Sequence, residues 1–434
     1  RDYYASRGLG DVYKRQSSES QPKVVNRWLV IFGTALVQLG VGTFYAWSIF
    51  NTPILKMFHQ LVLDPATGKP AAVQPHLGSI SLIFSIGALA LSLSTIFVGS
   101  LVKKFGVRKV TISAGILFGI SVFIASRVSS ADQLWLYYLS AGVMLGAADG
   151  IAYMSTLSNA IKWFPEKTGL ISGISVAFYG LGSFVFKYID SAFLGTNIVH
   201  NLPHALMAWG FLSMLLIVGG ALFIHDAPEA KAEDVVDDPT HHEFTTREML
   251  RKPQAYLLFI ALLTISLSVY LTGISSNLGT NLAGLDIAQA TNIVAVVAIA
   301  NTIGRFLIGS LSDKFGRKPM FILSYVVTFI AVATLAFSSH LSVPAFYAAM
   351  IAVGFFFGGT ITVYPTMVGD YFGLKNHSQN YSLIYQGFGF GSLAGAIILS
   401  LAGGNLSVVF NIYMVMLIVS LLIWVFIKKP VYKN

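Results

Sequence analysis

Arg305 stands in the middle of an apolar run, IGRFL at 303–307, too deep for its side chain to reach water easily. An arginine at the centre of a membrane helix costs about 2.5 to 3.5 kcal/mol on insertion scales, and a partner or a function must offset that cost. Its planar guanidinium can bind a carboxylate through two parallel hydrogen bonds, which strengthen where water is excluded. Arg305 therefore predicts a binding site for an organic anion. The alternative is a structural ion pair with an acidic residue.

Asn301 precedes Arg305 by four residues, which places both on one face of a helix. Its amide can either hydrogen-bond the bound carboxylate or hold Arg305 in place. The sequence leaves these two roles open.

Asp149 lies in the segment GAADG at 146–150, deep in an apolar run of the first half. Burial disfavours the charged form of a carboxyl, so such a group can exchange a proton as its surroundings change. We therefore expect Asp149 to be a proton-coupling residue; a structural partner of Lys187 or Arg305 is the alternative. Lys187 is the second proton-coupling candidate, as a partner of Asp149; alternatively it can pair with Asp190 three residues later or act as a second cation for the ligand.

Five aromatic residues in apolar runs are candidates for lining the same site. A phenol has a polar tip on an apolar body, which suits a cavity that binds a small organic anion loosely enough to release it. Packing is the alternative for each tyrosine, and the phenylalanines are expected to form apolar walls. The set is Tyr45, Tyr179, Phe357, Tyr385 and Phe388.

Other kinds of chemistry find little support. The sequence has no cysteine, which excludes disulfides and thiolate metal sites. His241 and His242 are adjacent and poorly arranged to chelate one metal, so we expect neither a metal nor a cofactor. No nucleophile, base and orienting group can be assembled, and an enzyme is not expected.

The elements that must hold these residues are membrane-spanning helices. The chain is 55% hydrophobic and 11% charged, whereas about a quarter of the residues in a soluble domain are charged. Apolar runs of about 20 residues recur, each long enough to cross the hydrocarbon core. They predict an all-α membrane protein with spans at 27–51, 78–102, 107–128, 134–162, 168–194, 203–225, 254–281, 286–312, 317–338, 342–371, 377–401 and 403–427.

The remaining segments connect or flank these spans. Residues 1–16 resemble a non-native remnant, and 17–26 and 428–434 are expected to be tails. Segment 226–253 is expected to link a six-helix bundle at 27–225 to a second at 254–427. Lys and Arg outside residues 1–16 number 19 on the side that holds both termini and three on the other, which predicts cytoplasmic termini. The net charge of +9 thus reflects topology, and nucleic acid is not an expected partner.

The two halves repeat each other in sequence. GSLVKKFG at 99–106 recurs as GSLSDKFG at 309–316, and YGLGS at 179–183 as FGFGS at 388–392. The offsets, 210 and 209, are nearly equal. Such a repeat is typical of transporters that alternate access to a central site.

GSLSDKFGRK at 309–318, with its copy in the first half, resembles the signature loop of the major facilitator superfamily. The segments YAWS at 45–48, KWFPEKTG at 162–169, YGLG at 179–182 and NY at 380–381 are similar to the oxalate:formate antiporter and bacterial monocarboxylate transporter group. The resemblance covers roughly residues 27–429. It implies two six-helix bundles around a midplane site, small carboxylate substrates, and gating residues at Gly99, Gly106, Gly309, Asp313, Gly316 and Arg317.

The same resemblance implies roles for single residues. Arg305 occupies the place of the group's carboxylate-binding arginine, eleven residues before Gly316. The antiporter's second cation, a lysine, would fall at Phe388, and its absence favours a monocarboxylate. Asp149 stands where the group tends to have an aromatic hydroxyl, which favours proton symport. Lys103 replaces the acidic residue of the first-half signature, a change in gating or in cytoplasmic charge.

We therefore expect a proton-coupled carrier of a small monocarboxylate such as lactate, pyruvate or formate, acting as a monomer in a bacterial inner membrane. The alternative is an exchanger of oxalate for formate, in which Lys187 replaces the missing cation. A membrane receptor that has lost transport is a third, less favoured, alternative.

Overall fold

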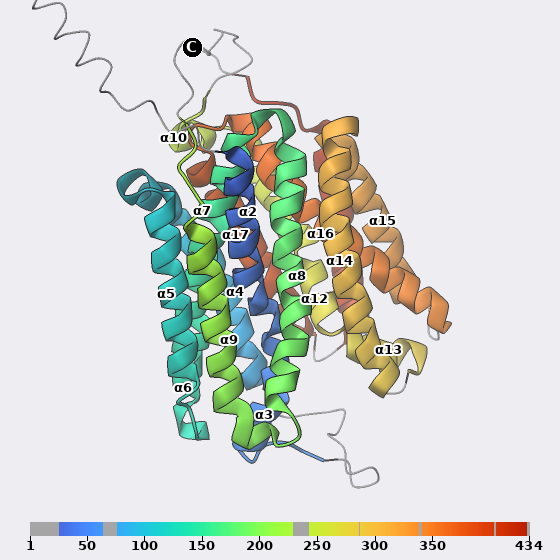
Figure 1. The fold of residues 1–434 in the computed structure, drawn as a ribbon. Helices are drawn as coiled ribbons and strands as arrows, with labels where there is room; N and C mark the ends of the chain where they lie inside the picture. Colours follow the sequence, from blue (N-terminus) through green and yellow to red (C-terminus); the bar gives the residue numbers. More distant parts are fainter. Residues whose placement is uncertain are drawn as a thin grey trace, which may run out of the picture.

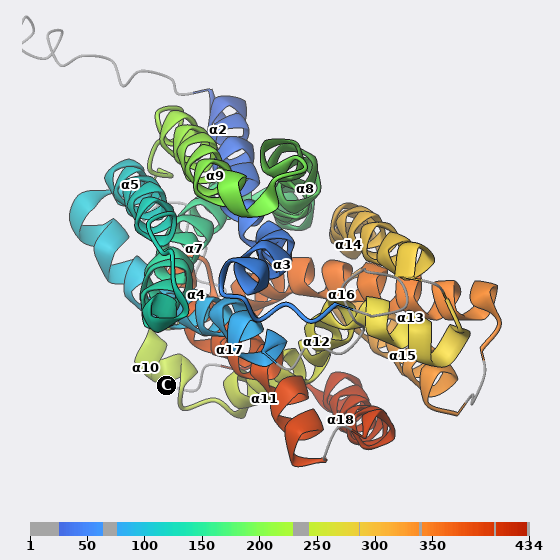
Figure 2. The ribbon, with the colours of Figure 1, turned by 90° about the horizontal axis from the view of Figure 1, so that it is seen from below.

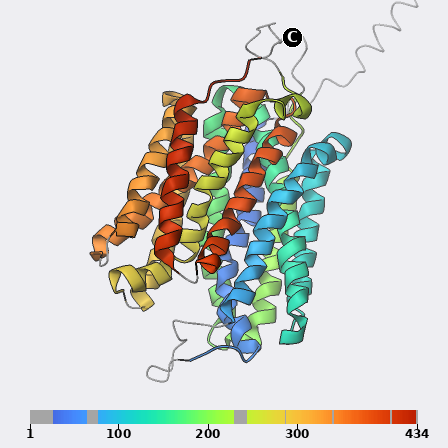
Figure 3. The ribbon, with the colours of Figure 1, turned by 180° about the vertical axis from the view of Figure 1, so that it is seen from behind.

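The computed structural model describes residues 26–63, 76–228, 243–285, 287–337, 341–402 and 405–431. The expected remnant at 1–16, the expected tail up to residue 25 and the histidine pair 241–242 lie outside the described residues. The described chain forms long helices that run side by side (Figures 1 and 3). Seen along the bundle, the helices of residues 27–221 and those of residues 253–426 form two neighbouring groups (Figure 2).

The first group contains α2 (Arg27–Val41), the 3-10 segment η1 (Gly42–Trp47), α3 (Ser48–Met57), α4 (Leu77–Phe105), α5 (Val107–Ala125), α6 (Leu134–Tyr137), the π-helix η3 (Tyr138–Met144), α7 (Leu145–Trp163), α8 (Thr168–Leu194) and α9 (Ile198–Ala221). The second group, with the short α10 before it, comprises α10 (Thr246–Met249), α11 (Pro253–Ile265), α12 (Leu267–Gly273), α13 (Ser275–Ala283), α14 (Ile287–Phe315), α15 (Arg317–Phe337), α16 (Val343–Phe372), α17 (His377–Leu401) and α18 (Leu406–Phe426).

Eleven stretches of the described residues are long and apolar enough to cross a membrane. α17, with 25 residues, is a further long helix and packs against α4 of the first group. Large apolar side chains lie on the outside of the bundle, among them Phe97, 64% exposed, and Phe426, 73% exposed. Such a surface is stable against lipid and not against water. The predicted all-helical membrane fold is confirmed.

Three predicted spans are not single α-helices, and the span expected at 134–162 is one of them, because it passes through α6, the π-helix η3 and α7. The span expected at 254–281 is divided into α11, α12 and α13, with breaks at Ser266 and Ile274. The Ser266 hydroxyl donates to the carbonyl oxygen of Leu262, a bond that bends helices, and Gly273 precedes the second break. In the first span, α2 gives way to η1 at Gly42, where an added Cβ would lie 1.8 Å from the carbonyl oxygen of Tyr179.

Glycine contacts set the distance between the helices that carry the candidate site. A Cβ on Gly304 of α14 would lie 2.0 Å from the carbonyl oxygen of Phe355 in α16. A Cβ on Gly146 of α7 would lie 2.2 Å from the carbonyl oxygen of Gly87 in α4. Both pairs of helices therefore approach backbone to backbone, as small residues allow in membranes.

Gly304→Ala is expected to destabilise the protein by about 1 to 3 kcal/mol or more, because backbone atoms cannot move aside as a flexible side chain can. The measurement is the apparent unfolding temperature of the purified protein. Gly219→Ala in α9 is the matched control, since a Cβ there has no atom within 4 Å. Equal unfolding temperatures for the two variants would contradict the proposed close contact of α14 with α16.

Candidate functional site

Arg305 extends from α14 of the second group into the first group of helices. Its side chain is almost fully buried, with a residue exposure of 6%. Nε donates to Asn301 Oδ1 at 2.8 Å, and Nη1 donates to the carbonyl oxygen of Val176 in α8 at 2.9 Å. These bonds use two of the five N–H groups of the guanidinium. Among the described residues no carboxylate lies within ion-pair distance of Arg305.

Asn301 is engaged at both ends of its amide. Oδ1 accepts the bond from Arg305, and Nδ2 donates to the carbonyl oxygen of Gly354 in α16 at 2.9 Å. An amide used in this way orients its neighbour. Of the two roles that the sequence leaves open, this geometry favours holding Arg305 in place.

The contacts of Arg305 extend into the first group of helices, from Arg305 to Tyr179 and from Tyr179 to Asp149. The Tyr179 hydroxyl donates to Asp149 Oδ2 at 3.0 Å, and the guanidinium carbon of Arg305 lies 5.6 Å from the centre of the Tyr179 ring. Asp149 is fully buried, and its Oδ1 has no hydrogen-bond partner in the described part of the chain. Tyr179 therefore connects the predicted anion-binding residue to the predicted proton-coupling residue.

Aromatic rings surround this connection. Tyr45 of η1 lies 5.7 Å, ring centre to ring centre, from Tyr179, and Tyr385 of α17 is stacked on Phe388 at 5.0 Å. Tyr153 joins the two pairs, at 5.5 Å from Tyr179 and 5.6 Å from Tyr385. The structure thus brings together four of the predicted aromatic residues and adds Tyr153. Its signal in the sequence is its position four residues after Asp149, on the same helical face.

Two predicted residues lie apart from the ring cluster. Phe357 is buried in α16. It precedes Gly358, where an added Cβ would lie 2.3 Å from the carbonyl oxygen of Asn301. Among the described residues, no ring contact joins Phe357 to the aromatic cluster. Lys187 follows Tyr179 by eight residues, or about 12 Å along α8. In the described chain it forms no ion pair with Asp149 or Asp190, and the Asp190 carboxyl is buried with neither oxygen hydrogen-bonded.

The second signature loop joins the two groups of helices at one end, called here the basic end, which carries residues 103–108 and 314–318. Asp313 Oδ1 accepts from the backbone N–H of Gly169 at 3.0 Å, and Oδ2 accepts from that of Leu170 at 2.7 Å. Arg317 donates to Asp313 at 2.5 Å, to Asp370 at 3.2 Å and to Thr168 Oγ1 at 2.9 Å. An anionic group at a helix N-terminus is a favourable arrangement, so Asp313 holds α8 against α14.

The glycines of the signatures have structural reasons of their own. Gly316 has φ +89° and Gly106 has φ +80°, values that disfavour other residues. Gly309 packs against Gly169, where an added Cβ would lie 3.0 Å from its carbonyl oxygen. A Cβ on Gly99 would lie 2.2 Å from Gln379 of α17. All four positions allow the chain to turn or the halves to approach at the basic end.

The first signature makes a weaker contact with the opposite half. Lys103 stands at the position that corresponds to Asp313, and its Nζ donates to Asn376 Oδ1 at 3.4 Å. A cation beside the N-terminus of α17 does not gain the favourable dipole interaction that Asp313 has. Deeper in the bundle, along the same pair of helices, Gln386 Nε2 donates to the carbonyl oxygen of Ser92 at 2.6 Å. The closed basic end is therefore asymmetric.

Asp313→Asn is expected to open the basic end more often, because hydrogen bonds to a charged group contribute about 1.5 to 3 kcal/mol. The chain has no native cysteine, so Ser172→Cys can report on this. The Ser172 hydroxyl is buried and donates to the carbonyl oxygen of Thr362 across the halves at 2.7 Å. We expect its thiol-labelling rate to rise about tenfold when Asp313 is replaced.

Asp226→Asn is the matched control for that measurement. Asp226 Oδ1 accepts from the backbone N–H of Val107 at 2.8 Å, a helix cap of the same kind that lies within the first group alone. An equal rise in labelling in both variants would show general loosening and would contradict the role of Asp313.

The protein has two groups of membrane-spanning helices, which close together at one end. They enclose a buried cation whose N–H groups are only partly hydrogen-bonded. This architecture is that of a secondary transporter. The chain belongs to the Major Facilitator Superfamily, whose model matches residues 28–291 and 267–434. It is 38% identical over 368 residues to an uncharacterized MFS-type transporter, YhjX, of Escherichia coli, with 85% of this chain and 86% of that protein aligned. The oxalate:formate antiporter of Oxalobacter formigenes is 28% identical over 375 residues, covering 85% of this chain and 83% of its own.

The fold is also that of a solved transporter. The structure of the proton:xylose symporter XylE superposes with a TM-score of 0.74 over 93% of this chain and 96% of XylE, at 13% sequence identity. At that identity the likeness concerns the fold alone. The predicted family and transporter class are confirmed.

Proposed function

We propose that the protein carries a small monocarboxylate, of the lactate, pyruvate or formate class, together with a proton. The observation that carries this proposal is the environment of Arg305. Its guanidinium is buried between the halves, has no carboxylate partner in the described chain, and contacts the ring of Tyr179, which is bonded to Asp149. A buried cation with unused N–H groups fits an incoming carboxylate.

The charged groups of this site fit a substrate with a single negative charge. Arg305 is the cation among the clustered residues, while Phe388 lies stacked on Tyr385 where a second cation would stand in the antiporter group. Lys187 is too far along α8 to bind the same small molecule. Aromatic carbon around one carboxylate-binding group favours a substrate with one carboxylate and a short carbon end.

Asp149 supports the proton as the coupled ion. A buried carboxylate without a cationic partner is costly, and the neutral acid avoids that cost. Tyr179 contacts both Asp149 and Arg305. A change of charge at either group therefore changes the electrostatic environment of the other. Because one proton and one monoanion together carry no net charge, the pH gradient drives such a cycle and the membrane potential does not.

The direction of transport rests on the charge distribution. Excess Lys and Arg at the basic end favour a cytoplasmic location for it and for both termini, in an inner membrane. The hydrogen bonds between the halves that involve Asp313 and Arg317 close this end. We therefore propose that the structure represents a state closed to the cytoplasm, to which substrate gains access from the opposite side.

The test is uptake by the purified protein in liposomes with an alkaline interior. Labelled lactate, pyruvate or formate should accumulate, and a potential imposed by a potassium ionophore should not change the accumulated amount. If none of the three accumulates, the proposed function is wrong.

Exchange of oxalate for formate is the second candidate, favoured by the 28% identity to the antiporter. Counterflow from oxalate-loaded vesicles that does not depend on pH would support it over symport. A thermal-shift screen with mono- and dicarboxylates tests substrate charge independently, because a ligand that binds the folded state raises the unfolding temperature.

A further inference from the structure

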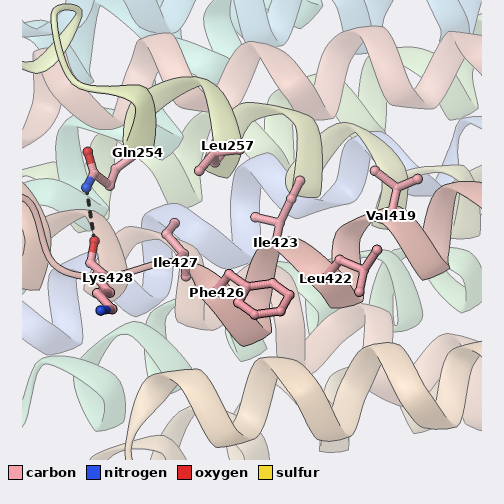
Figure 4. A pocket seen from close by; sticks show the side chains of 8 residues that line it. All are labelled: Gln254, Leu257, Val419, Leu422, Ile423, Phe426, Ile427 and Lys428. Carbon is pink, nitrogen blue, oxygen red and sulfur yellow. Dashed lines mark hydrogen bonds between the residues drawn. The ribbon is translucent and has the colours of Figure 1, made fainter.

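A groove runs along the outer surface of the second group of helices, between α11 and α18, far from Arg305. Its volume is about 500 Å³. Six apolar side chains line it: Leu257 of α11, Val419, Leu422, Ile423 and Phe426 of α18, and Ile427. Gln254 and Lys428 close one end, where Gln254 Nε2 donates to the carbonyl oxygen of Lys428 at 3.1 Å (Figure 4).

The groove lies on a surface that faces lipid. Val419 is 46% exposed, Leu422 54% and Phe426 73%, and all three lie on α18, which is one of the membrane spans. Exposed side chains of this kind contact acyl chains in a bilayer. The apolar part of the groove therefore fits a hydrocarbon chain.

The polar end of the groove is basic. Lys428 lines it and is exposed. Lys318 Nζ donates to the carbonyl oxygens of Val425 at 2.8 Å and Ile427 at 3.1 Å, and Lys252 Nζ donates to that of Val431 at 2.8 Å. Three ammonium groups thus surround the end of α18, each with three N–H donors. In the described residues none of them pairs with a carboxylate.

We propose that this groove binds one phospholipid with an anionic headgroup, its chain along α11 and α18 and its phosphate at Lys428. The acyl chain alone cannot distinguish one lipid from another, because the apolar side chains of the groove attract all lipid tails about equally. The headgroup can, since each lysine near a membrane surface favours an anionic lipid by about fivefold in affinity. The site is independent of the proposed substrate.

Native mass spectrometry of the full-length protein in detergent tests this. The protein is titrated with phosphatidylglycerol or phosphatidylcholine carrying identical chains. We expect the wild type to prefer phosphatidylglycerol by about fivefold or more, and Lys428→Gln to lose about fivefold in affinity for that lipid alone. Lys104→Gln, a loss of one charge at the same end of the first group, should keep the preference.

Leu422→Trp fills the groove and should weaken the binding of both lipids, whereas Leu215→Trp, at a 51% exposed position of α9, should weaken neither. Glycerol 3-phosphate should fail to displace bound phosphatidylglycerol. The proposal is wrong if the wild type shows no preference, if Lys104→Gln and Lys428→Gln lose affinity equally, or if glycerol 3-phosphate competes as well as the lipid.

Discussion

Arg305→Lys should lower the initial rate of carboxylate uptake by about 100-fold or more, the equivalent of losing one or two hydrogen bonds to charged groups. An ammonium group has no planar fork and cannot bind a carboxylate through two parallel bonds. It also cannot span from Asn301 Oδ1 to the carbonyl oxygen of Val176 as the guanidinium does. The measurement is initial uptake of labelled substrate in liposomes, with substrate affinity followed by thermal shift.

Arg108→Lys is the matched control. Arg108 Nε donates to the carbonyl oxygen of Ile224 at 2.9 Å at the basic end, away from the site, so the same substitution there should leave uptake nearly unchanged. Near-normal uptake by Arg305→Lys would assign Arg305 a structural role and remove the observation that carries the proposed function.

Asp149→Asn should remove proton-driven accumulation and keep exchange. The amide matches the carboxyl in size and still offers an oxygen to the Tyr179 hydroxyl, but it cannot take up or release a proton. In a one-to-one symporter, a gradient of one pH unit drives about tenfold accumulation, equivalent to about 1.4 kcal/mol. The variant should reach no accumulation, while labelled substrate still equilibrates between the two sides.

Asp190→Asn is the control for that experiment, because Asp190 is as deeply buried as Asp149 but has no contact with Tyr179 or Arg305 among those described. Proton-driven accumulation should survive this substitution. An unchanged pH profile in Asp149→Asn would exclude Asp149 from coupling, and loss of accumulation in both variants would show that neutralising any buried acid in α7 or α8 is harmful.

The sequence predicts those candidate site residues whose signal lies within a single segment of the chain. Arg305 and Asp149 stand out because a charge inside an apolar run is costly wherever the helix packs. Helical spacing predicts Asn301 and leaves two roles open, and its bond to Gly354 of the neighbouring helix favours the role of holding Arg305 in place. Tyr153 is not among the predicted residues, because its signal, a position four residues after Asp149, becomes informative only once the surrounding rings are known to meet there.

The sequence by itself determined the membrane class, the approximate spans, the repeat and the depth of Arg305, because hydrophobic length and charge position act within each segment. Only the tertiary structure decided that Arg305 meets Val176, that Tyr179 reaches Asp149 and that Lys187 stays apart. Those contacts depend on how each helix is rotated against its neighbour. Backbone contacts at glycines such as Gly304 set that rotation, and they form between segments far apart in the chain.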